Sequence, residues 1–142
     1  MNLLERLLHR RPKSIQPLTH RHGVLGENAA KKHLRKKGLK FLTANFNSGR
    51  GEIDLIFRDD DCLVFVEVKT RSSEAWVRPA AYVNKEKRLR LTRCAFDYLR
   101  LLRSPEIKIR FDVVEVLLLD GDIKEVRHLP NSFTLSPPYR YG

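Results

Sequence analysis

The sequence predicts an α/β fold in which helices flank a mixed β-sheet of about five strands. Two long segments repeat apolar residues at helical spacing, and each is followed by runs rich in β-branched and aromatic residues. The resulting order is helix, three strands, helix, two strands, which is typical of a layered α/β domain. The chain of 142 residues has no internal repeat, so we expect a single domain with one modest core.

The first helix is expected at about residues 24–37. Its apolar residues recur at helical spacing, Lys and Arg crowd the other side, and Gly38 is a natural C-terminal stop. The segment LKFLTANF then predicts a strand, and NSGRG predicts a turn. Two further strands are expected at 52–58 and 62–70, joined by an Asp-rich turn.

A loop at 71–83 leads to a second helix at about 85–103, for which Asn84 is a good N-cap. IKIRFDVVEVLLL predicts the next strand, and IKEVRHL predicts its hairpin partner after an Asp-Gly-Asp turn. The expected domain organisation is a basic N-terminal tail at 1–20, a folded domain at 21–128 and a Pro-rich C-terminal tail at 129–142.

The chain is strongly basic, with 28 Lys and Arg against 17 Asp and Glu, a formal charge of +11 and a pI near 10.1. A domain of this charge suggests a polyanionic partner, and we expect nucleic acid, DNA in particular. A membrane partner is not expected, because no apolar run approaches the length of a membrane span. Charge that only aids solubility is the simpler alternative.

The cysteines and the N-terminus indicate the compartment. Cys62 and Cys94 lie in expected core elements without a Cys-x-x-Cys pattern, which fits two buried free thiols in a reducing environment. The opening segment MNLLERLLHRR has charges inside its Leu pattern and makes a poor signal peptide. We therefore expect a cytoplasmic protein.

The hairpin formed by the second and third strands carries the chemistry. A two-residue turn at Asp60-Asp61 places Asp54 opposite Glu67, and Glu52 opposite Lys69, with Cβ atoms about 4.5–5.5 Å apart. Two facing carboxylates repel each other unless a proton or cation lies between them. Mg²⁺, or alternatively Mn²⁺, suits such oxygen ligands and leaves positions for water and phosphate. Lys69 could then orient an attacking water or stabilise charge on a phosphate.

The alternative is a solvated hairpin face, on which Glu52 and Lys69 form a surface ion pair. Against it, CLVFVEV is apolar on both faces around Glu67, which favours a covered strand. Glu27 lies on the buried stripe of the first helix, where it either interacts with the helix dipole or serves as a third metal ligand. Spacing alone does not decide between these two roles.

Several basic residues are candidates for contact with phosphates, although charged helix faces are usually only solvated. The candidates on the second helix are Lys85, Lys87, Arg88 and Arg90, and those flanking the hairpin are Arg50 and Arg71. For Asp112 we expect a structural hydrogen-bonding role rather than a metal-binding one.

These residues resemble a known nuclease pattern. Asp54, a hairpin and then Glu67-Val68-Lys69 resemble the PD-(D/E)xK nuclease motif, with Ile53 where a proline usually stands. The segments GVLGENAAKKHLRKKG, GEIDLI, VFVEVKTR, KRLRL and RFDVV also resemble the YraN-type family of uncharacterised bacterial proteins, over about residues 22–118. Trp76-Val77 stands where that family usually has Phe-Gly.

The resemblance implies a restriction endonuclease-like fold, similar to archaeal Holliday-junction resolvases, with an Mg²⁺ site on the central hairpin. It implies that Asp54 and Glu67 are metal ligands, that Lys69 is the catalytic lysine and that Glu27 is the first-helix acid of the site. Resolvase-like proteins often dimerise, so a homodimer is possible, although the sequence shows no self-complementary surface.

Three functions fit these residues. The first is a metal-dependent endonuclease that acts on structured or branched DNA through attack of an activated water on a phosphodiester. The second is a nucleic-acid-binding protein that keeps the nuclease scaffold without turnover. The third is an interaction protein that uses a basic helix within residues 1–20.

Overall fold

The computed structural model describes residues 18–72, 83–103 and 106–135. Its elements are α2 (Leu18–Lys36), β1 (Lys40–Asn47), β2 (Glu52–Asp59), β3 (Cys62–Ser72), α3 (Lys85–Leu102), β4 (Lys108–Leu119) and β5 (Asp122–Phe133). The expected helix within residues 1–20 lies almost wholly outside the described residues, and Trp76-Val77 lies outside them too.

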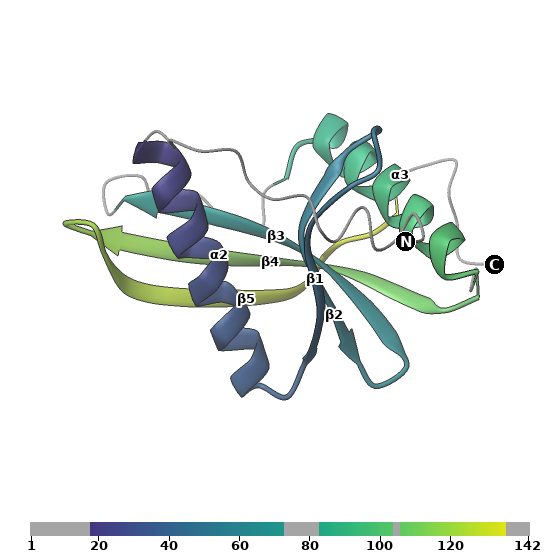
Figure 1. The fold of residues 1–142 in the computed structure, drawn as a ribbon, viewed down its shortest axis with the longest axis horizontal. Coiled ribbons are helices and arrows are strands. Elements are labelled where there is room, and N and C mark those ends of the chain that lie inside the picture. The colour runs from purple at the N-terminus through teal and green to yellow at the C-terminus, as the bar shows by residue number, and fades with distance from the viewer. Residues whose placement is uncertain (1–17, 73–82, 104–105, 136–142) are drawn as a thin grey trace, which may run out of the picture.

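The strands form one mixed sheet in the order β1-β2-β3-β4-β5 (Figure 1). β3 and β4 are parallel, whereas the other neighbouring pairs are antiparallel. A parallel pair needs a crossover connection, and α3 lies in the segment that joins β3 to β4. The predicted α/β fold, a mixed sheet flanked by helices, is confirmed and is consistent with a restriction endonuclease-like fold.

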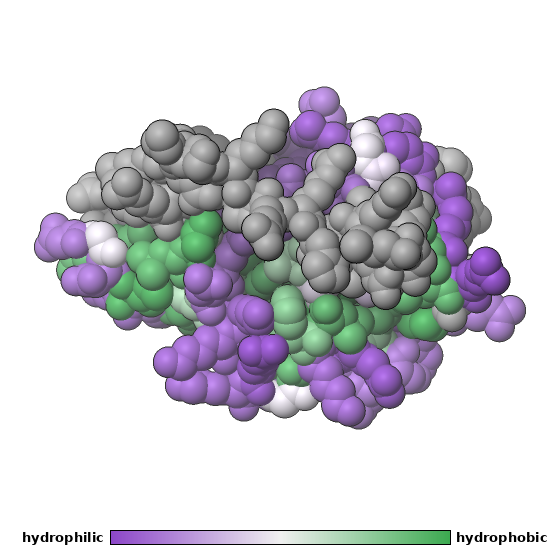
Figure 2. All heavy atoms as spheres, viewed as in Figure 1, coloured by the Kyte–Doolittle hydropathy of each residue, from purple (hydrophilic) through white to green (hydrophobic). Residues whose placement is uncertain are grey.

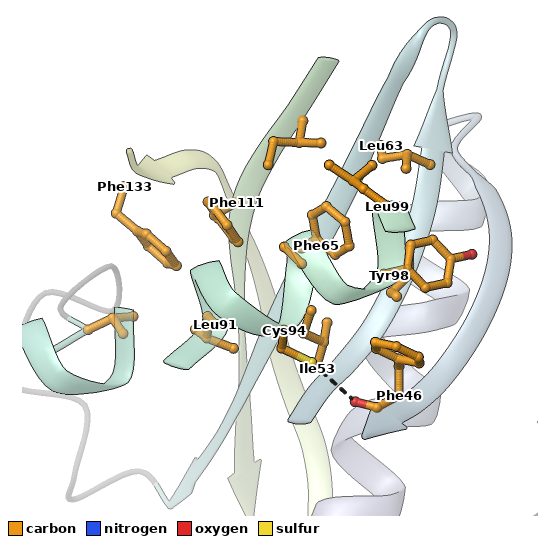
Figure 3. Close-up of a cluster of buried hydrophobic side chains, with 14 of the residues drawn as sticks. Phe46, Ile53, Leu63, Phe65, Leu91, Cys94, Tyr98, Leu99, Phe111 and Phe133 are labelled. Carbon is orange, nitrogen blue, oxygen red and sulfur yellow. Dashed lines mark hydrogen bonds between the residues drawn. The ribbon is translucent and has the colours of Figure 1, made fainter. Parts of the chain in front are cut away.

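The hydrophobic core has one half on each face of the sheet. On one face, Leu34 of α2 packs in a cluster with Val64 and Val66 of β3. On the other face, Tyr98 of α3 packs edge-on to Phe65 of β3, with ring centroids 6.0 Å apart (Figure 3). Side chains alternate along a strand, so the odd-numbered residues of β3 that follow Phe65 also belong to the α3 face.

The ends of the elements follow local rules. Gly38, with φ +93°, ends α2, and the Asn84 side chain caps α3 by accepting a hydrogen bond from Lys87 N at 2.8 Å. β5 continues to Phe133, past the expected end of the domain at residue 128. Two causes account for the extension: Phe133 stacks on Phe111 at 4.7 Å between centroids, and an edge strand tolerates Pro130.

Asp112 anchors β4 to β5. Its carboxylate is fully buried and accepts hydrogen bonds from Arg110 Nε at 3.0 Å and Asn131 N at 2.9 Å, and it lies 2.7 Å from His128 Nε2. Burial alone would raise the pKa of Asp112, but the hydrogen bonds with His128 and Arg110 lower it overall. The expected structural role of Asp112 is confirmed.

Both cysteines are free, with Cys94 buried and Cys62 only half-buried at the start of β3. The Cys94 thiol donates to the carbonyl of Gly51 at 3.3 Å, so it helps to hold the start of β2 against α3.

Within the described ranges, no helix is long and apolar enough to cross a lipid bilayer.

Gly26 allows α2 to approach the end of β3 closely. A Cβ atom at this position would overlap the side-chain oxygen of Thr70. The neighbouring Glu27 is thereby held near the end of β3, toward the carboxylates of the hairpin. Packing at Gly26 therefore determines where the α2 layer meets the sheet.

We expect Gly26→Ala to lower the free energy of unfolding by about 1–3 kcal/mol, because the added methyl group overpacks the contact with Thr70. The matched control is Gly23→Ala in the same helix, since a Cβ there meets no described atom within 4 Å. Its higher helix propensity should stabilise the protein by up to about 1 kcal/mol. Chemical denaturation measures both changes, and destabilisation of similar size in the two variants would contradict the close-packing explanation.

Candidate functional site

The hairpin has the register that the sequence predicts. The β2–β3 ladder runs from Asp59–Cys62 to Leu55–Val66, around a turn in which Asp60 has φ +51°. Asp54 and Glu67 are therefore the next residues along the two strands, just beyond the end of the ladder. The expected pairing of Glu52 with Lys69 lies outside the ladder with β3, and on the other edge of β2 Glu52 pairs with Asn47 of β1.

The Asp54 side chain provides the next hydrogen bond between β2 and β3 after the backbone ladder ends. Asp54 Oδ2 accepts a hydrogen bond from Val68 N at 2.8 Å, so the carboxylate bridges the two separating strands. Burial and the neighbouring Glu67 raise the pKa of Asp54 to about 8, although the Val68 hydrogen bond opposes the shift. The charge of Glu67 therefore acts on Asp54 and disfavours its ionised form.

Glu67 is buried, with 6% of its surface exposed, and its partner comes from the opposing helix. The ammonium of Lys87 forms an ion pair with Glu67 Oε1. Asn84 caps α3 so that the first turn of this helix lies over β3, which brings Lys87 to the carboxylate. Lys87, expected to contact phosphates from the surface, lies inside the candidate site.

An open cleft of about 330 Å³ lies between the hairpin and α3. It is lined by Gly51, Glu52, Asp54, Glu67, Lys87, Arg90 and Leu91. The two facing carboxylates come from β2 and β3, whereas the basic residues come from α3. The cleft therefore joins an acidic site to a basic rim, which is the charge pattern that a divalent cation and a phosphate would require together.

Lys69 follows Glu67 on the same face of β3 and is half-buried. Burial and then Arg71 lower the pKa of Lys69, while Glu67 opposes the shift. The Arg71 guanidinium lies 3.5 Å from Glu115 Oε1, and Glu115 is the neighbour of Lys69 in the parallel ladder with β4. Lys69 thus lies half-buried among the charges of Glu67, Arg71 and Glu115.

Glu115 is the residue at this site that the sequence analysis missed. It is completely buried, and its carboxylate oxygens accept no hydrogen bond from the described residues. Its signal was present, since Glu115 interrupts the apolar run VVEVLLL in the same way as Glu67 interrupts VFVEV. A charge within an apolar strand therefore indicated the site twice.

Glu27 comes from the other layer of the fold. It is half-buried on α2, and its charge contributes to the raised pKa of Asp54, so it lies within electrostatic reach of the hairpin carboxylates. Across the described ranges, no three His, Cys, Asp or Glu side chains gather closely enough to hold a metal ion together. The structure therefore brings Asp54 and Glu67 together and leaves Glu27 further away.

The remaining residues predicted to contact phosphates differ in their exposure and in their hydrogen-bond partners. Arg50 is held by Asp97 through two contacts, Nε to Oδ2 at 3.0 Å and Nη2 to Oδ1 at 2.7 Å, which tie the β1–β2 turn to α3. Lys85 is exposed at the start of α3. Arg88 is half-buried, and its Nε has no hydrogen-bond partner among the described residues.

The donor chemistry of the facing pair suits a hard divalent cation. Asp54 and Glu67 offer only oxygen atoms. Burial and the nearby charge of Glu67 raise the pKa of Asp54 to about 8, and a bound cation would favour the ionised carboxylate. Mg²⁺ is commonly held by one or two carboxylates together with water and substrate phosphate. The two carboxylates therefore fit Mg²⁺ or Mn²⁺ without requiring a third protein ligand.

The raised pKa of Asp54 predicts a pH-dependent stability. The folded state keeps the Asp54 proton up to a pH of about 8, whereas the unfolded chain releases it near 3.8, so this residue favours folding at low pH and opposes it as pH rises. We expect Asp54→Asn to be about 1–3 kcal/mol more stable than the wild type at pH 8 in EDTA, and similar at pH 4.

Asp97→Asn is the control of opposite sign for this prediction. The Arg50 hydrogen bond lowers the pKa of Asp97, so its stabilisation is present at neutral pH and is lost only at strongly acidic pH. This variant should be less stable than the wild type between pH 5 and pH 8. Thermal unfolding between pH 4 and pH 8 measures both changes, and an Asp54→Asn variant less stable than the wild type at pH 8 would contradict the raised pKa of Asp54.

Comparison with known proteins places the chain in a family. Residues 26–116 match the family described as "Uncharacterised protein family UPF0102". A UPF0102 protein of Trichlorobacter lovleyi is 40% identical over 115 residues, covering 80% of this chain and 91% of the relative. Another, from Syntrophomonas wolfei, is 42% identical over 111 residues, covering 78% and 96%. The matched range includes the residues of the candidate site, Glu27, Asp54, Glu67, Lys69 and Glu115. We conclude that the chain belongs to the UPF0102 family, the YraN-type family that its motifs resemble.

Proposed function

We propose that this protein is a metal-dependent endonuclease that cleaves structured or branched DNA. One observation carries the proposal: two carboxylates, Asp54 and Glu67, face each other beneath an open cleft whose rim is formed by Lys87 and Arg90. A purely structural pair of buried carboxylates would be costly, because their repulsion is only partly offset by one ammonium group. A site for a divalent cation and a phosphate explains both the acids and the basic rim.

In this proposal, the residues have distinct roles. Asp54 and Glu67 hold Mg²⁺, with Glu27 contributing from α2 through its charge or through a bridging water. When bound, the metal ion supplies a water of lowered pKa and neutralises charge on the phosphate. The Lys69 ammonium stabilises the phosphate as the water oxygen bonds to phosphorus and the P–O bond to the leaving nucleotide oxygen breaks. The attacking water loses a proton to solvent, and the leaving oxygen takes one up from solvent. Arg90 and Lys85 hold the backbone of the nucleic acid.

The charge of the whole chain agrees with this partner. A net charge of +11 favours polyanions, and the phosphate backbone of nucleic acid provides most of the affinity in non-specific binding. The preference for branched DNA rests on the resemblance to archaeal Holliday-junction resolvases. A homodimer, which the same resemblance suggests, would present two clefts to one substrate.

A second function, nucleic-acid binding without cleavage, is favoured by one feature of the site. The Lys87 ammonium already neutralises Glu67, and the described residues bring together no group of three metal-binding side chains. A protein of this kind would bind DNA in a salt-sensitive manner without binding Mg²⁺. Calorimetry with Mg²⁺ and Mn²⁺ separates the two functions, because only the nuclease requires metal binding.

We expect Glu67→Gln to abolish Mg²⁺-dependent cleavage of a DNA four-way junction, by at least about a hundredfold, since it removes a ligand charge and leaves the shape of the side chain. The matched control is Glu86→Gln, an exposed acid in the first turn of α3, which should cleave like the wild type. Circular dichroism should show that both variants are folded. A wild type that cleaves no linear, nicked or four-way DNA and no RNA with Mg²⁺ or Mn²⁺ would refute the nuclease.

We expect Lys87→Gln to bind Mn²⁺ about two- to fivefold more tightly than the wild type, because a partly exposed ion pair of this kind contributes up to about 1 kcal/mol. A cation bound at Glu67 must displace the Lys87 ammonium, and the variant has no ammonium to displace. Lys85→Gln, two residues earlier on α3, is the control and should leave Mn²⁺ affinity unchanged. Isothermal titration calorimetry measures this effect, and weaker Mn²⁺ binding by Lys87→Gln would contradict the competition.

A further inference from the structure

A hollow lined by basic residues lies on the exposed side of α2, the helix that covers the face of the sheet opposite α3. The hollow has a volume of about 390 Å³ and is lined by Asn28, Lys31, Lys32, Arg35 and Lys36, the α2 basic surface. The spacing of these residues places them on one side of the helix, whereas Ala30 and Leu34 face the sheet. Figure 2 shows hydrophilic side chains covering the C-terminal half of α2.

The charges of this surface are unbalanced. Four of its five lining residues are cations and none is acidic. Lys31 with Arg35, and Lys32 with Lys36, are like-charged pairs at i and i+4, which destabilise a helix by a few tenths of a kcal/mol each. The helix dipole offsets part of this cost for Arg35 and Lys36 in the last turns. A polyanion would relieve the remainder.

Two of these cations are held in place before any ligand arrives. Lys31 Nζ lies 3.8 Å from the ring centroid of Phe41, and Arg35 Cζ lies 5.1 Å from it. Phe41 itself packs edge-on to Phe57, a fully buried residue of β2. A cation resting on an aromatic ring loses less conformational freedom on binding, and its N–H groups remain available to an anion.

The location of the surface separates it from the cleft. α2 packs on the face of the sheet formed by Val64 and Val66, whereas the cleft lies between the hairpin and α3. A short duplex bound in the cleft therefore leaves the α2 basic surface open. The lining residues include no apolar side chain, which argues against insertion into a lipid bilayer, where an apolar helix face is needed.

We propose that the α2 basic surface binds the phosphate backbone of a second nucleic-acid segment. One chain then holds two duplex segments, one in the cleft and one on the α2 basic surface. This inference rests on the proposed function and specifies its substrate as DNA with two nearby duplex arms. The surface provides affinity without reading bases, since Lys and Arg contacts to phosphates carry no sequence information. A single linear duplex would occupy only one of the two surfaces.

The test compares two matched double variants of the full chain in EDTA. Lys32→Gln with Lys36→Gln removes two exposed lysines from the α2 basic surface, and Lys108→Gln with Lys124→Gln removes two exposed lysines that line neither this surface nor the cleft. The probe is a fluorescent DNA duplex of about 10 base pairs, and sedimentation gives the number of duplexes bound by each protein chain.

We expect two duplexes per chain for the wild type and for the Lys108/Lys124 control, and one for the Lys32/Lys36 variant. On a four-way junction, the slope of log Kd against log salt should be smaller than the wild-type slope by about 2 for the Lys32/Lys36 variant. The control should show a smaller reduction in this slope. Lys32→Arg with Lys36→Arg should restore both values. An unchanged stoichiometry and slope, or equal losses in the control, would overturn the inference, as would a wild type that binds only one duplex or none.

Three further outcomes separate this inference from its competitors. A wild type that binds two duplexes but cleaves nothing supports the α2 basic surface and contradicts the nuclease, whereas cleavage with only one bound duplex supports the nuclease and overturns the inference. Vesicles containing phosphatidylserine provide the membrane comparison. Loss of vesicle binding by the Lys32/Lys36 variant, with DNA stoichiometry unchanged, would assign the surface to lipid and overturn the proposal.

Discussion

The buried carboxylate of Glu67 requires a positive charge within reach, and much of the site follows from this requirement. Lys87 meets it from α3, so the helix has to begin at Asn84 with its first turn over β3. One ammonium cannot neutralise two carboxylates, however, and burial together with the charge of Glu67 raises the pKa of Asp54 to about 8. The cleft thus has the electrostatic character of a site that favours either a proton or an added cation.

The fold creates this situation by ending a β-ladder early. Backbone pairing between β2 and β3 stops at Leu55 and Val66, and the Asp54 side chain accepts the next backbone N–H, that of Val68. Beyond the end of this ladder a cleft opens, while the β3–β4 ladder continues without a register shift from Cys62–Lys108 to Ser72–Leu118. On the other layer, the absence of a side chain at Gly26 lets α2 approach Thr70 and carries the charge of Glu27 toward the same carboxylates.

Two buried acids of β4 differ in how their charge is balanced by the residues around them. Asp112 is surrounded by hydrogen bonds from Arg110, His128 and Asn131, which lower its pKa and join two strands. Glu115 lies three residues further along β4, where its oxygens accept no hydrogen bond from the described residues and the Arg71 guanidinium lies 3.5 Å from Oε1. The first residue holds the sheet together, whereas the second contributes charge beside Lys69.

The sequence by itself determined the fold class, the hairpin register and the facing of Asp54 and Glu67, because side-chain alternation and a two-residue turn act over short distances along the chain. The apolar neighbours of Glu115 in VVEVLLL also indicate a buried acid. Only the tertiary structure decided that Lys87 pairs with Glu67, that Asp97 holds Arg50 and that β5 reaches Phe133. Each of these contacts joins residues far apart in the sequence, and their positions depend on how α3, β4 and β5 pack together, which local patterns do not specify.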